Sequence, residues 1–323
     1  MKTVVPLPEL PPTSALGFGC ASLGGRVSAA DGLRALAIAW DTGVRYFDTA
    51  RSYGYGESER LLGRFVRTRA RDRVVVATKA GILAGRPTLP RRAAKAAARA
   101  VFDLAPGLRA ALRPSLGRQH QAGHFAPGEV VASAEASLRE LGCGHLDLLM
   151  LHDAPRAVAF DDDVLASLES LRDRGLVRAF GLSTSAEVAA EALAAGRPFR
   201  AIQLTYHLGD QRGDAVARAR GERPLLAVAN QPFGGGAHAA TLGARLRALA
   251  PSEPELADRL LGTPGPALVA DVALNAVLTS PLAPIAVTAA TDPTHLHDNA
   301  RAVTHPRFTP AEYARLRVRL APG

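Results

Sequence analysis

The chain has 323 residues, enough for a large core, and its composition of 47% hydrophobic and 21% charged residues is ordinary for a soluble globular protein. Its formal net charge is +9, but most of this charge lies in one segment: residues 82–126 contain eight Lys or Arg side chains and one acid, Asp103. The rest of the chain is nearly neutral, so we expect no nucleic-acid-binding surface. The two cysteines, Cys20 and Cys143, provide neither a disulfide framework nor metal-ligand spacing, so we expect a reduced, cytoplasmic protein without a metal site. No apolar run is long enough to span a membrane.

Short apolar runs alternate with helical patterns along the chain. The runs cover residues 16–20, 44–49, 74–79, 146–152, 179–183, 201–206, 225–230 and 285–289. Most are unbroken, as expected for parallel strands buried on both faces. Helical patterns cover residues 31–42, 58–69, 127–141, 164–175, 186–195 and 266–280, with a last helix at 310–320. Eight such units predict an α/β fold, a (β/α)₈ TIM barrel with one domain over residues 1–323.

Some segments do not fit the regular alternation. Residues 1–14 look irregular, and the interval after the third strand contains a basic insertion at about 82–126. A second long interval contains the glycines 234–236 and a helical pattern near 253–261. Both intervals leave the C-terminal end of a strand, so we expect them to overhang the mouth of the barrel. The basic insertion is compatible with a solvated helix pair, with a lid over the pocket, or with a patch for a partner or a membrane surface.

Four polar side chains lie at or just past the C-terminal ends of predicted strands, where an α/β barrel collects its chemistry. Asp48, Lys79 and His152 end the second, third and fourth strands, and Tyr53 lies in the loop after Asp48. Alone, each has an ordinary explanation: a helix cap, a packed aromatic, a solvated amine or a structural hydrogen bond. Their joint placement favours catalysis instead.

The four side chains suit the reduction of a carbonyl group by hydride transfer. An ammonium beside a phenol lowers the phenol's pKa from its ordinary value of about 10, and such a phenol can give a proton to a developing alkoxide. Asp48 would keep Lys79 charged, and His152 would hydrogen-bond the carbonyl oxygen. The hydride must come from a cofactor, since no side chain supplies one.

The sequence resembles the aldo-keto reductase family over nearly its whole length. The matching stretches are residues 17–25, 47–59, 77–79, 137–142, 146–153, 180–183, 202–206 and 296–299. This resemblance implies a (β/α)₈ barrel, a catalytic tetrad of Asp48, Tyr53, Lys79 and His152 with the tyrosine as general acid, and a small-molecule carbonyl substrate. It also implies a nicotinamide cofactor across the mouth, more often NADPH, with NADH possible.

The resemblance assigns the cofactor-binding positions as well. The nicotinamide end falls at Ser183, Thr184, Gln203 and Asn230, the pyrophosphate loop at Gln231, Phe233 and Gly235, and the adenosine end at Thr291, His295, Asp298 and Asn299. Thr184 and Asn230 depart from the family pattern, which has an asparagine and often an aromatic there. Asp292 and Pro293 predict the start of a helix, whose N-terminus favours a phosphate. Residues 288–292 offer no cation for the 2′-phosphate of NADPH.

Two other functions stay open at this point. A non-catalytic regulatory protein on the same fold would bind a nicotinamide nucleotide but would not need the acid Tyr53. A non-reductive biosynthetic enzyme would use the tetrad for an isomerisation or a dehydration.

Overall fold

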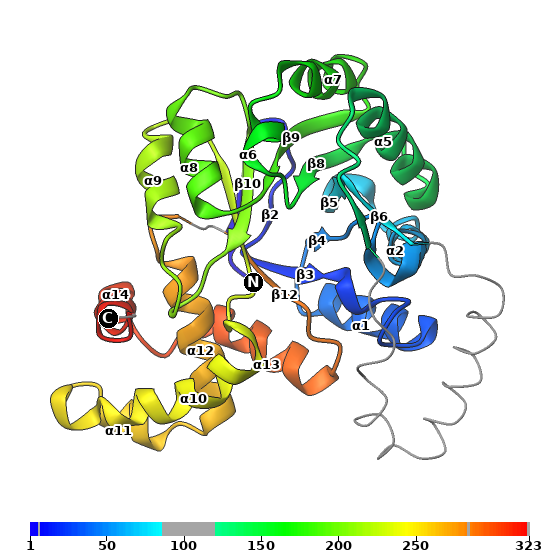
Figure 1. Ribbon diagram of the computed structural model, residues 1–323. Helices are drawn as coiled ribbons and strands as arrows, with labels where there is room; N and C mark the ends of the chain where they lie inside the picture. Colours follow the sequence, from blue (N-terminus) through cyan, green and yellow to red (C-terminus); the bar gives the residue numbers. More distant parts are fainter. Residues whose placement is uncertain (6, 86–119, 283–284, 322–323) are drawn as a thin grey trace.

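The computed structural model describes residues 1–5, 7–85, 120–282 and 285–321 (Figure 1). Eight parallel strands form a closed barrel in the order β10-β11-β12-β3-β4-β5-β8-β9. Their bounds are β3 Leu16–Gly19, β4 Tyr46–Asp48, β5 Val75–Ala80, β8 Leu146–His152, β9 Val177–Ser183, β10 Ala201–Thr205, β11 Leu226–Asn230 and β12 Ile285–Thr288. The predicted (β/α)₈ TIM barrel is therefore confirmed.

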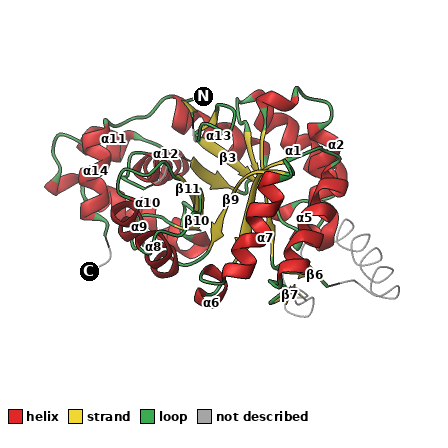
Figure 2. Ribbon diagram, turned by 90° about the horizontal axis from the view of Figure 1, so that it is seen from above, coloured by secondary structure: helices red, strands yellow, loops and turns green. Residues whose placement is uncertain are grey.

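Helices surround the ring of strands, as Figures 1 and 2 show. Those that follow the strands are α1 Ala29–Asp41, α2 Glu57–Val66, α5 Pro127–Leu141, α7 Asp162–Asp173, α8 Ala186–Ala194, α9 Asp214–Arg220, α12 Gly265–Leu278 and α13 Pro293–Thr304, with a short α6 Arg156–Ala159 before α7. The final helix, α14, spans Pro310–Arg319. The sequence did not predict α9, which is short and rich in arginine.

The barrel interior is a packed cluster of side chains from the inner faces of the strands. Its members include the strand residues Val75, Leu148 and Ile285. Two residues of the N-terminal segment, Leu7 and Leu10, belong to the same cluster. This segment is more regular than expected, because β1 (Thr3–Val4) and β2 (Thr13–Ser14) pair antiparallel. The expectation of an irregular N-terminus is thus wrong for these strands, which are too short for sequence periodicity to reveal.

The described ends of the basic insertion form a small sheet of their own. β6 (Ile82–Ala84) pairs antiparallel with β7 (His120–Ala122). All eight basic side chains lie within residues 86–119, which are outside the described residues. The interpretations of this insertion therefore stay predictions.

The second long interval forms a helical lobe at one side of the barrel, at the lower left of Figure 1. It contains α10 (Gly235–Ala248), which was not predicted, and α11 (Ala257–Gly262). Together with α12 and α14 these helices enclose a separate hydrophobic cluster that includes Leu242, Leu260, Val272 and Leu316. The lobe thus packs mainly beside the barrel. The first turn of α10 contacts the segment after β10 through the rings of His238 and His207.

Candidate active site

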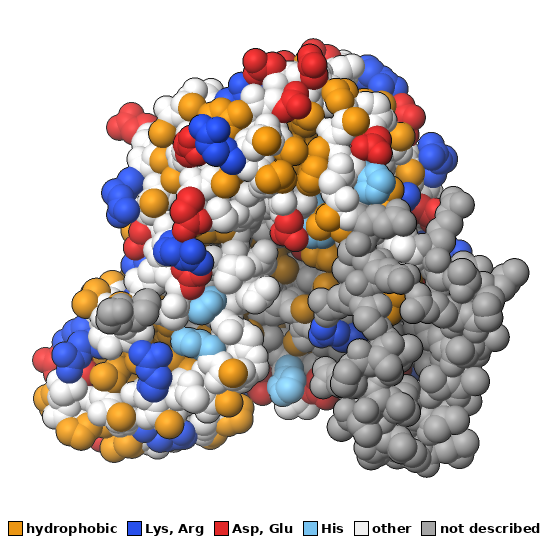
Figure 3. Space-filling model, viewed as in Figure 1, with side chains coloured by type: hydrophobic (Ala, Val, Ile, Leu, Met, Phe, Trp, Pro, Cys, Tyr) orange, Lys and Arg blue, Asp and Glu red, His pale blue; other side chains and the backbone are white. Residues whose placement is uncertain are grey.

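The inner faces of several strands end in polar side chains. Because successive side chains of a strand point to opposite faces, Val75, Ala77 and Lys79 all lie on the inner face of β5, and only the last is polar. By the same alternation, Tyr46 and Asp48 share the inner face of β4, and Met150 and His152 share the inner face of β8. The mainly apolar interior is therefore followed, two residues later, by a layer of ionisable side chains. Figure 3 shows one face of the molecule with a hollow at its centre and histidine side chains around it.

Lys79 and Asp48 form a buried ion pair at the centre of this layer. The ammonium Nζ lies 2.7 Å from each carboxylate oxygen of Asp48 and donates a further hydrogen bond of 3.0 Å to the carbonyl oxygen of Thr49. Burial alone would lower the pKa of Lys79, but the neighbouring Asp48 and Tyr53 outweigh it, so that the pKa is raised. Lys79 therefore stays positively charged at neutral pH.

Tyr53 lies directly above this ion pair. Its hydroxyl oxygen accepts a hydrogen bond from Lys79 Nζ at 3.4 Å, and its ring meets the ring of His152 edge-on with 5.7 Å between centroids. The structure thus brings together the four side chains that the sequence singled out. We expected Lys79 to lower the pKa of the phenol, but burial outweighs that effect, and the pKa of Tyr53 is raised above its ordinary value.

The loop that carries Tyr53 has an unusual backbone. Gly54, Tyr55 and Gly56 all have positive φ angles, of 59°, 60° and 88°. A Cβ atom on Gly54 would lie 2.0 Å from the carbonyl oxygen of Leu23, so only glycine fits this close approach. The glycines of the sequence motif therefore allow the loop to fold back tightly and present Tyr53 to the strand ends.

A hydrogen-bonded chain joins the ion pair to two expected cofactor-binding residues. Gln203 Nε2 donates to Asp48 Oδ1 at 3.1 Å, and Ser183 Oγ donates to Gln203 Oε1 at 3.2 Å. All three side chains are buried. Thr184 is oriented differently, since its hydroxyl donates to the carbonyl oxygen of Ala154 at 2.6 Å. The link between Gln203 and Asp48 was not predicted, because sequence spacing does not show which amide reaches which carboxylate.

The end of β11 and the loop after it provide the next expected cofactor positions. Asn230 Oδ1 is buried and has no hydrogen-bond partner among the described residues. Gln231 has a positive φ of 51° and its carbonyl oxygen accepts from Gly234 N at 2.8 Å, which closes the turn into α10 at Gly235. Phe233 packs against the hydrophobic core, so part of its role is structural.

A pair of histidines beside this turn was not predicted. The ring centroids of His207 and His238 are 5.0 Å apart, and His207 Nδ1 accepts a hydrogen bond of 3.0 Å from Gly209 N. Burial, and then the proximity of His238, lowers the pKa of His207; burial, and then Arg245, lowers the pKa of His238. Both imidazoles are therefore neutral at pH 7. No sequence signal indicated this pair, because the two residues are far apart in the chain and in no motif.

The expected adenosine end lies at the start of α13. The predicted cap is present: Asp292 Oδ1 accepts hydrogen bonds from Thr294 N at 2.9 Å and from His295 N at 3.2 Å, and Pro293 is the first helical residue. Asn299 is buried, and Asp298 and Thr291 are partly exposed. The carboxylate of Asp292 thus occupies the backbone donors that we expected to be open to a phosphate.

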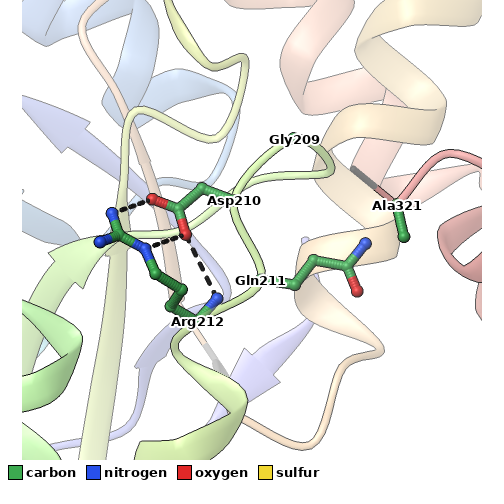
Figure 4. A pocket seen from close by; sticks show the side chains of 5 residues that line it. All are labelled: Gly209, Asp210, Gln211, Arg212 and Ala321. Carbon is green, nitrogen blue, oxygen red and sulfur yellow. Dashed lines mark hydrogen bonds and ion pairs between the residues drawn. The ribbon is translucent and has the colours of Figure 1, made fainter. Parts of the chain in front are cut away.

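A cleft of about 550 Å³ lies between the β10–α9 loop and the C-terminal end of the chain. It is lined by Gly209, Asp210, Gln211, Arg212 and Ala321, and Figure 4 shows Asp210 and Arg212 paired at its side. None of the four tetrad residues lines it, so we regard it as separate from the site.

Among the described residues, no three His, Cys, Asp or Glu side chains are grouped to hold a metal ion. The described helices include none with the length and apolarity needed to cross a membrane.

Comparisons with known proteins agree with this geometry. A D-threo-aldose 1-dehydrogenase from Pseudomonas sp is 38% identical over 177 residues, which is 53% of this chain and 50% of that protein. A pyridoxal 4-dehydrogenase from Microbacterium luteolum is 34% identical over 191 residues, 53% of this chain and 52% of that one. The chain therefore matches about half the length of these curated relatives.

Solved structures and a family profile extend the likeness to most of the chain. An aldo-keto reductase from Bacillus halodurans, in its holo form, has the same fold with a TM-score of 0.76 at 20% identity, covering 100% of this chain and 97% of that one. The profile of the Aldo/keto reductase family matches residues 15–238, which include the whole tetrad. The chain belongs to the aldo/keto reductase family.

Proposed function

We propose that this protein is an NAD(P)H-dependent oxidoreductase that reduces an aldehyde or ketone to an alcohol, with Tyr53 as general acid. The observation that carries the proposal is the contact of 3.4 Å between Lys79 Nζ and the hydroxyl of Tyr53, with Lys79 held by Asp48 and the ring of His152 beside it. A protonated phenol next to a fixed positive charge is suited to protonating a developing alkoxide.

The residues at the mouth fit a nicotinamide nucleotide. Ser183 and Gln203 together offer donors and acceptors to an amide, and the buried Asn230 Oδ1, which lacks a partner in the described structure, suits a donor group. The backbone from Gln231 to Gly235 would lie along the pyrophosphate, and the start of α13 would face the adenosine. When bound, the cofactor supplies or accepts the hydride.

The protein's own side chains would perform the remaining steps. Tyr53 and His152 would hydrogen-bond the carbonyl oxygen of the substrate and orient it. The Tyr53 proton would then move to this oxygen as negative charge develops there, and the positive charge of Lys79 would stabilise the phenolate that remains. Asp48 and Gln203 would hold Lys79 in place throughout.

The start of α13 argues for weak discrimination between the two cofactors. Family precedent favours NADPH, but residues 288–299 contain no Lys or Arg, and the carboxylate of Asp292 fills the helix N-terminus. A 2′-phosphate placed there would meet a negative charge in place of open donors. We propose that NADH is used within about tenfold of NADPH, a difference of ~1.4 kcal/mol.

The named relatives favour a second candidate, in which the protein oxidises a hydroxylated substrate. The two curated relatives described above are named as dehydrogenases of an aldose and of pyridoxal, both of which carry hydroxyl groups as well as an aldehyde. The tetrad serves this reverse direction equally, with Tyr53 accepting a proton in place of donating it.

Absorbance of the reduced cofactor tests both candidates. Purified protein would be mixed with NADH or NADPH and a panel of simple aldehydes, ketones, aldoses and pyridoxal, and with NAD⁺ or NADP⁺ and the aldoses and pyridoxal. We expect turnover with at least one carbonyl class. Cofactor binding without turnover on any member would indicate a nucleotide-binding regulatory protein, and substrate conversion without a change in absorbance would indicate a non-reductive enzyme.

A further inference from the structure

The loop that carries Tyr53 is tied to itself near its base. We use "Tyr53 loop" for residues 49–58. The hydroxyls of Thr49 and Ser58 are 2.9 Å apart, and Ser58 Oγ donates to the carbonyl oxygen of Cys20 at 2.9 Å. Because the single Ser58 proton goes to Cys20, Thr49 must be the donor to Ser58. The first and last residues of the loop are thus joined, and both are buried.

Glu59, the next residue, makes a second tie. Its side chain is fully buried in the first turn of α2. One carboxylate oxygen accepts a hydrogen bond of 2.6 Å from the hydroxyl of Thr78, and the other receives Arg51 at 3.3 Å. A buried carboxylate is costly unless its oxygens are paired, so Glu59 must hold these partners where they are.

The two partners of Glu59 each stand next to a tetrad residue in the chain. Thr78 precedes Lys79 on β5, and Arg51 lies two residues before Tyr53 in the Tyr53 loop. Glu59 therefore connects the strand that positions the ammonium with the loop that positions the phenol. The contact between these two groups is already long, at 3.4 Å, so a small displacement of either element would break it.

We propose that Glu59 is a positioning residue, which sets the separation between Lys79 Nζ and the Tyr53 hydroxyl through Thr78 on one side and Arg51 on the other. The proposal rests on the proposed function for its effect on rate. The expected effect of Glu59 on the titration of Tyr53 does not depend on the proposed function, because this titration can be followed in the cofactor-free protein.

The chain contains another buried carboxylate, Asp147, which serves as a matched control for Glu59. Asp147 is also fully buried beside the barrel sheet, near the opposite end of β8. It accepts from Val76 N at 2.8 Å and pairs with Arg71 at 2.7 Å and Arg178 at 3.1 Å, none of which touches the tetrad. Asp147→Asn therefore removes a buried charge of the same kind without reaching the reacting groups.

The experiment compares Glu59→Gln, Thr78→Val, Thr78→Ser and Asp147→Asn with the wild-type protein. For Glu59→Gln and Thr78→Val we expect kcat to fall about tenfold to a hundredfold, with KM and the cofactor Kd within about twofold. Thr78→Ser retains the hydroxyl and should restore kcat. Asp147→Asn should lower the melting temperature but leave kcat of the folded enzyme within about twofold.

The titration of Tyr53 provides a readout that a merely structural role would not move. The charged and titratable groups that face Tyr53 are Lys79, Asp48, His152 and Asp153. Lys79 lowers its pKa, so displacing Lys79 should raise the pKa of Tyr53 and move the loss of reductase activity to higher pH. Tyrosinate absorbance of the cofactor-free protein, with Tyr53→Phe as the blank, measures the same pKa without turnover.

The outcomes separate the two proposals. If the wild-type protein turns over no substrate, the proposed function fails, and the tyrosinate titration of Glu59→Gln still decides the positioning role. If Glu59→Gln and Thr78→Val lose stability but keep kcat and the Tyr53 titration, Glu59 is structural and the proposal is overturned. If Glu59→Gln does not fold, the contrast between Thr78→Val and Thr78→Ser decides it.

Discussion

Tyr53 carries the reactive proton in the proposed reaction, and its surroundings act on it in opposite directions. Burial raises its pKa, Lys79 lowers it, and Asp48 raises it again, with burial the largest effect. The phenol is therefore protonated across the neutral range. This state is ready to donate a proton, and the charge of Lys79 becomes valuable only once the phenolate forms.

Replacing Tyr53 with phenylalanine should remove the proton donor and leave the pocket intact. General acid catalysis contributes typically about 10²–10⁴ in rate, so reductase turnover should fall by at least that range, with the cofactor Kd within about twofold. Steady-state kinetics and fluorescence titration check this. Near wild-type turnover by Tyr53→Phe would rule out the tetrad assignment.

Tyr46 offers the control for this variant. Its hydroxyl is buried just below the site and has no hydrogen-bond partner among the described residues. Tyr46→Phe deletes the same phenolic oxygen from a tyrosine on β4, the strand that precedes the Tyr53 loop, but it should keep activity. Because an unsatisfied buried hydroxyl costs about 1–3 kcal/mol, the variant should be at least as stable as wild type.

At the scale of elements, the C-terminal helix α14 is held by side chains of both charge types. Tyr313 donates to the buried Asp271 at 2.7 Å, and Arg317 pairs with Asp214 at 2.6 Å. At the start of α14, Glu312 pairs with Arg259 at 2.6 Å and accepts from the backbone N–H of Thr309 at 2.7 Å. The last part of the chain is thus fastened to α9, α11 and α12.

Glu312→Gln should weaken this attachment in a pH-dependent way. Hydrogen bonding to Arg259 lowers the pKa of Glu312 from its ordinary value of 4.5 to about 2. A lowered carboxyl pKa stabilises the folded state above the unfolded pKa, and this stabilisation is lost as pH falls from about 4.5 towards 2. Since the ion pair is only partly buried and is screened by solvent, we expect a loss of only about 1 kcal/mol at pH 6, measured by thermal unfolding between pH 3 and 7.

The control for Glu312→Gln is Glu222→Gln. Glu222 is exposed, and no hydrogen bond or ion pair of it is present in the described structure. Its replacement should leave the melting temperature unchanged at every pH. An effect of Glu312→Gln that persists unchanged at pH 3 would contradict the assigned ion pair.

The sequence predicted those elements whose patterns are dictated by burial. The barrel strands were found because strands covered on both faces must be apolar throughout. Helix α10 was missed because it starts within glycines 234–236, where Gly234 takes a left-handed conformation at the cap. The hairpin of β1 and β2 was missed because two-residue strands have no period.

For the site, motif and strand order together indicated the four side chains that the structure brings together. What the sequence could not give were hydrogen bonds between distant side chains, such as Gln203 to Asp48 or Thr78 to Glu59. These depend on rotamers and on the packing of helices against the barrel. The direction of the Tyr53 pKa shift was predicted wrongly for the same reason, since the extent of burial is a property of the folded loop.

At the scale of the whole molecule, a nicotinamide nucleotide would lie across the mouth from Gln203 to the start of α13. We expect dissociation constants for NADH and NADPH within about tenfold of each other. Asp292→Asn should keep the helix cap while removing the negative charge. A charge at a helix end is worth ~0.3–1 kcal/mol, so the Kd of NADPH should fall about twofold to fivefold.

Asp161→Asn is the matched control for this variant. Asp161 caps α7 in the same way, by accepting from Asp163 N at 2.9 Å and Val164 N at 3.1 Å. It should change neither dissociation constant in a fluorescence titration. Equal effects of Asp292→Asn on NADH and NADPH, or a thousandfold preference for NADPH in the wild-type protein, would show that the 2′-phosphate is bound elsewhere.

The alternation of side chains along the barrel strands has a consequence for how such a protein can change over generations. Loss of one residue within β5, ahead of Lys79, would turn that side chain from the interior to the helix layer and bring Thr78 inward. Restoring an ammonium to the inward position would need a second change, such as a lysine in place of Ala80, which the shift brings inward. Loops that carry no tetrad residue are not bound by this alternation and can gain or lose residues, whereas the Tyr53 loop is fixed by its own hydrogen bonds. New substrate ranges should therefore arise by insertion and deletion at the rim, while the strands beneath admit only substitutions.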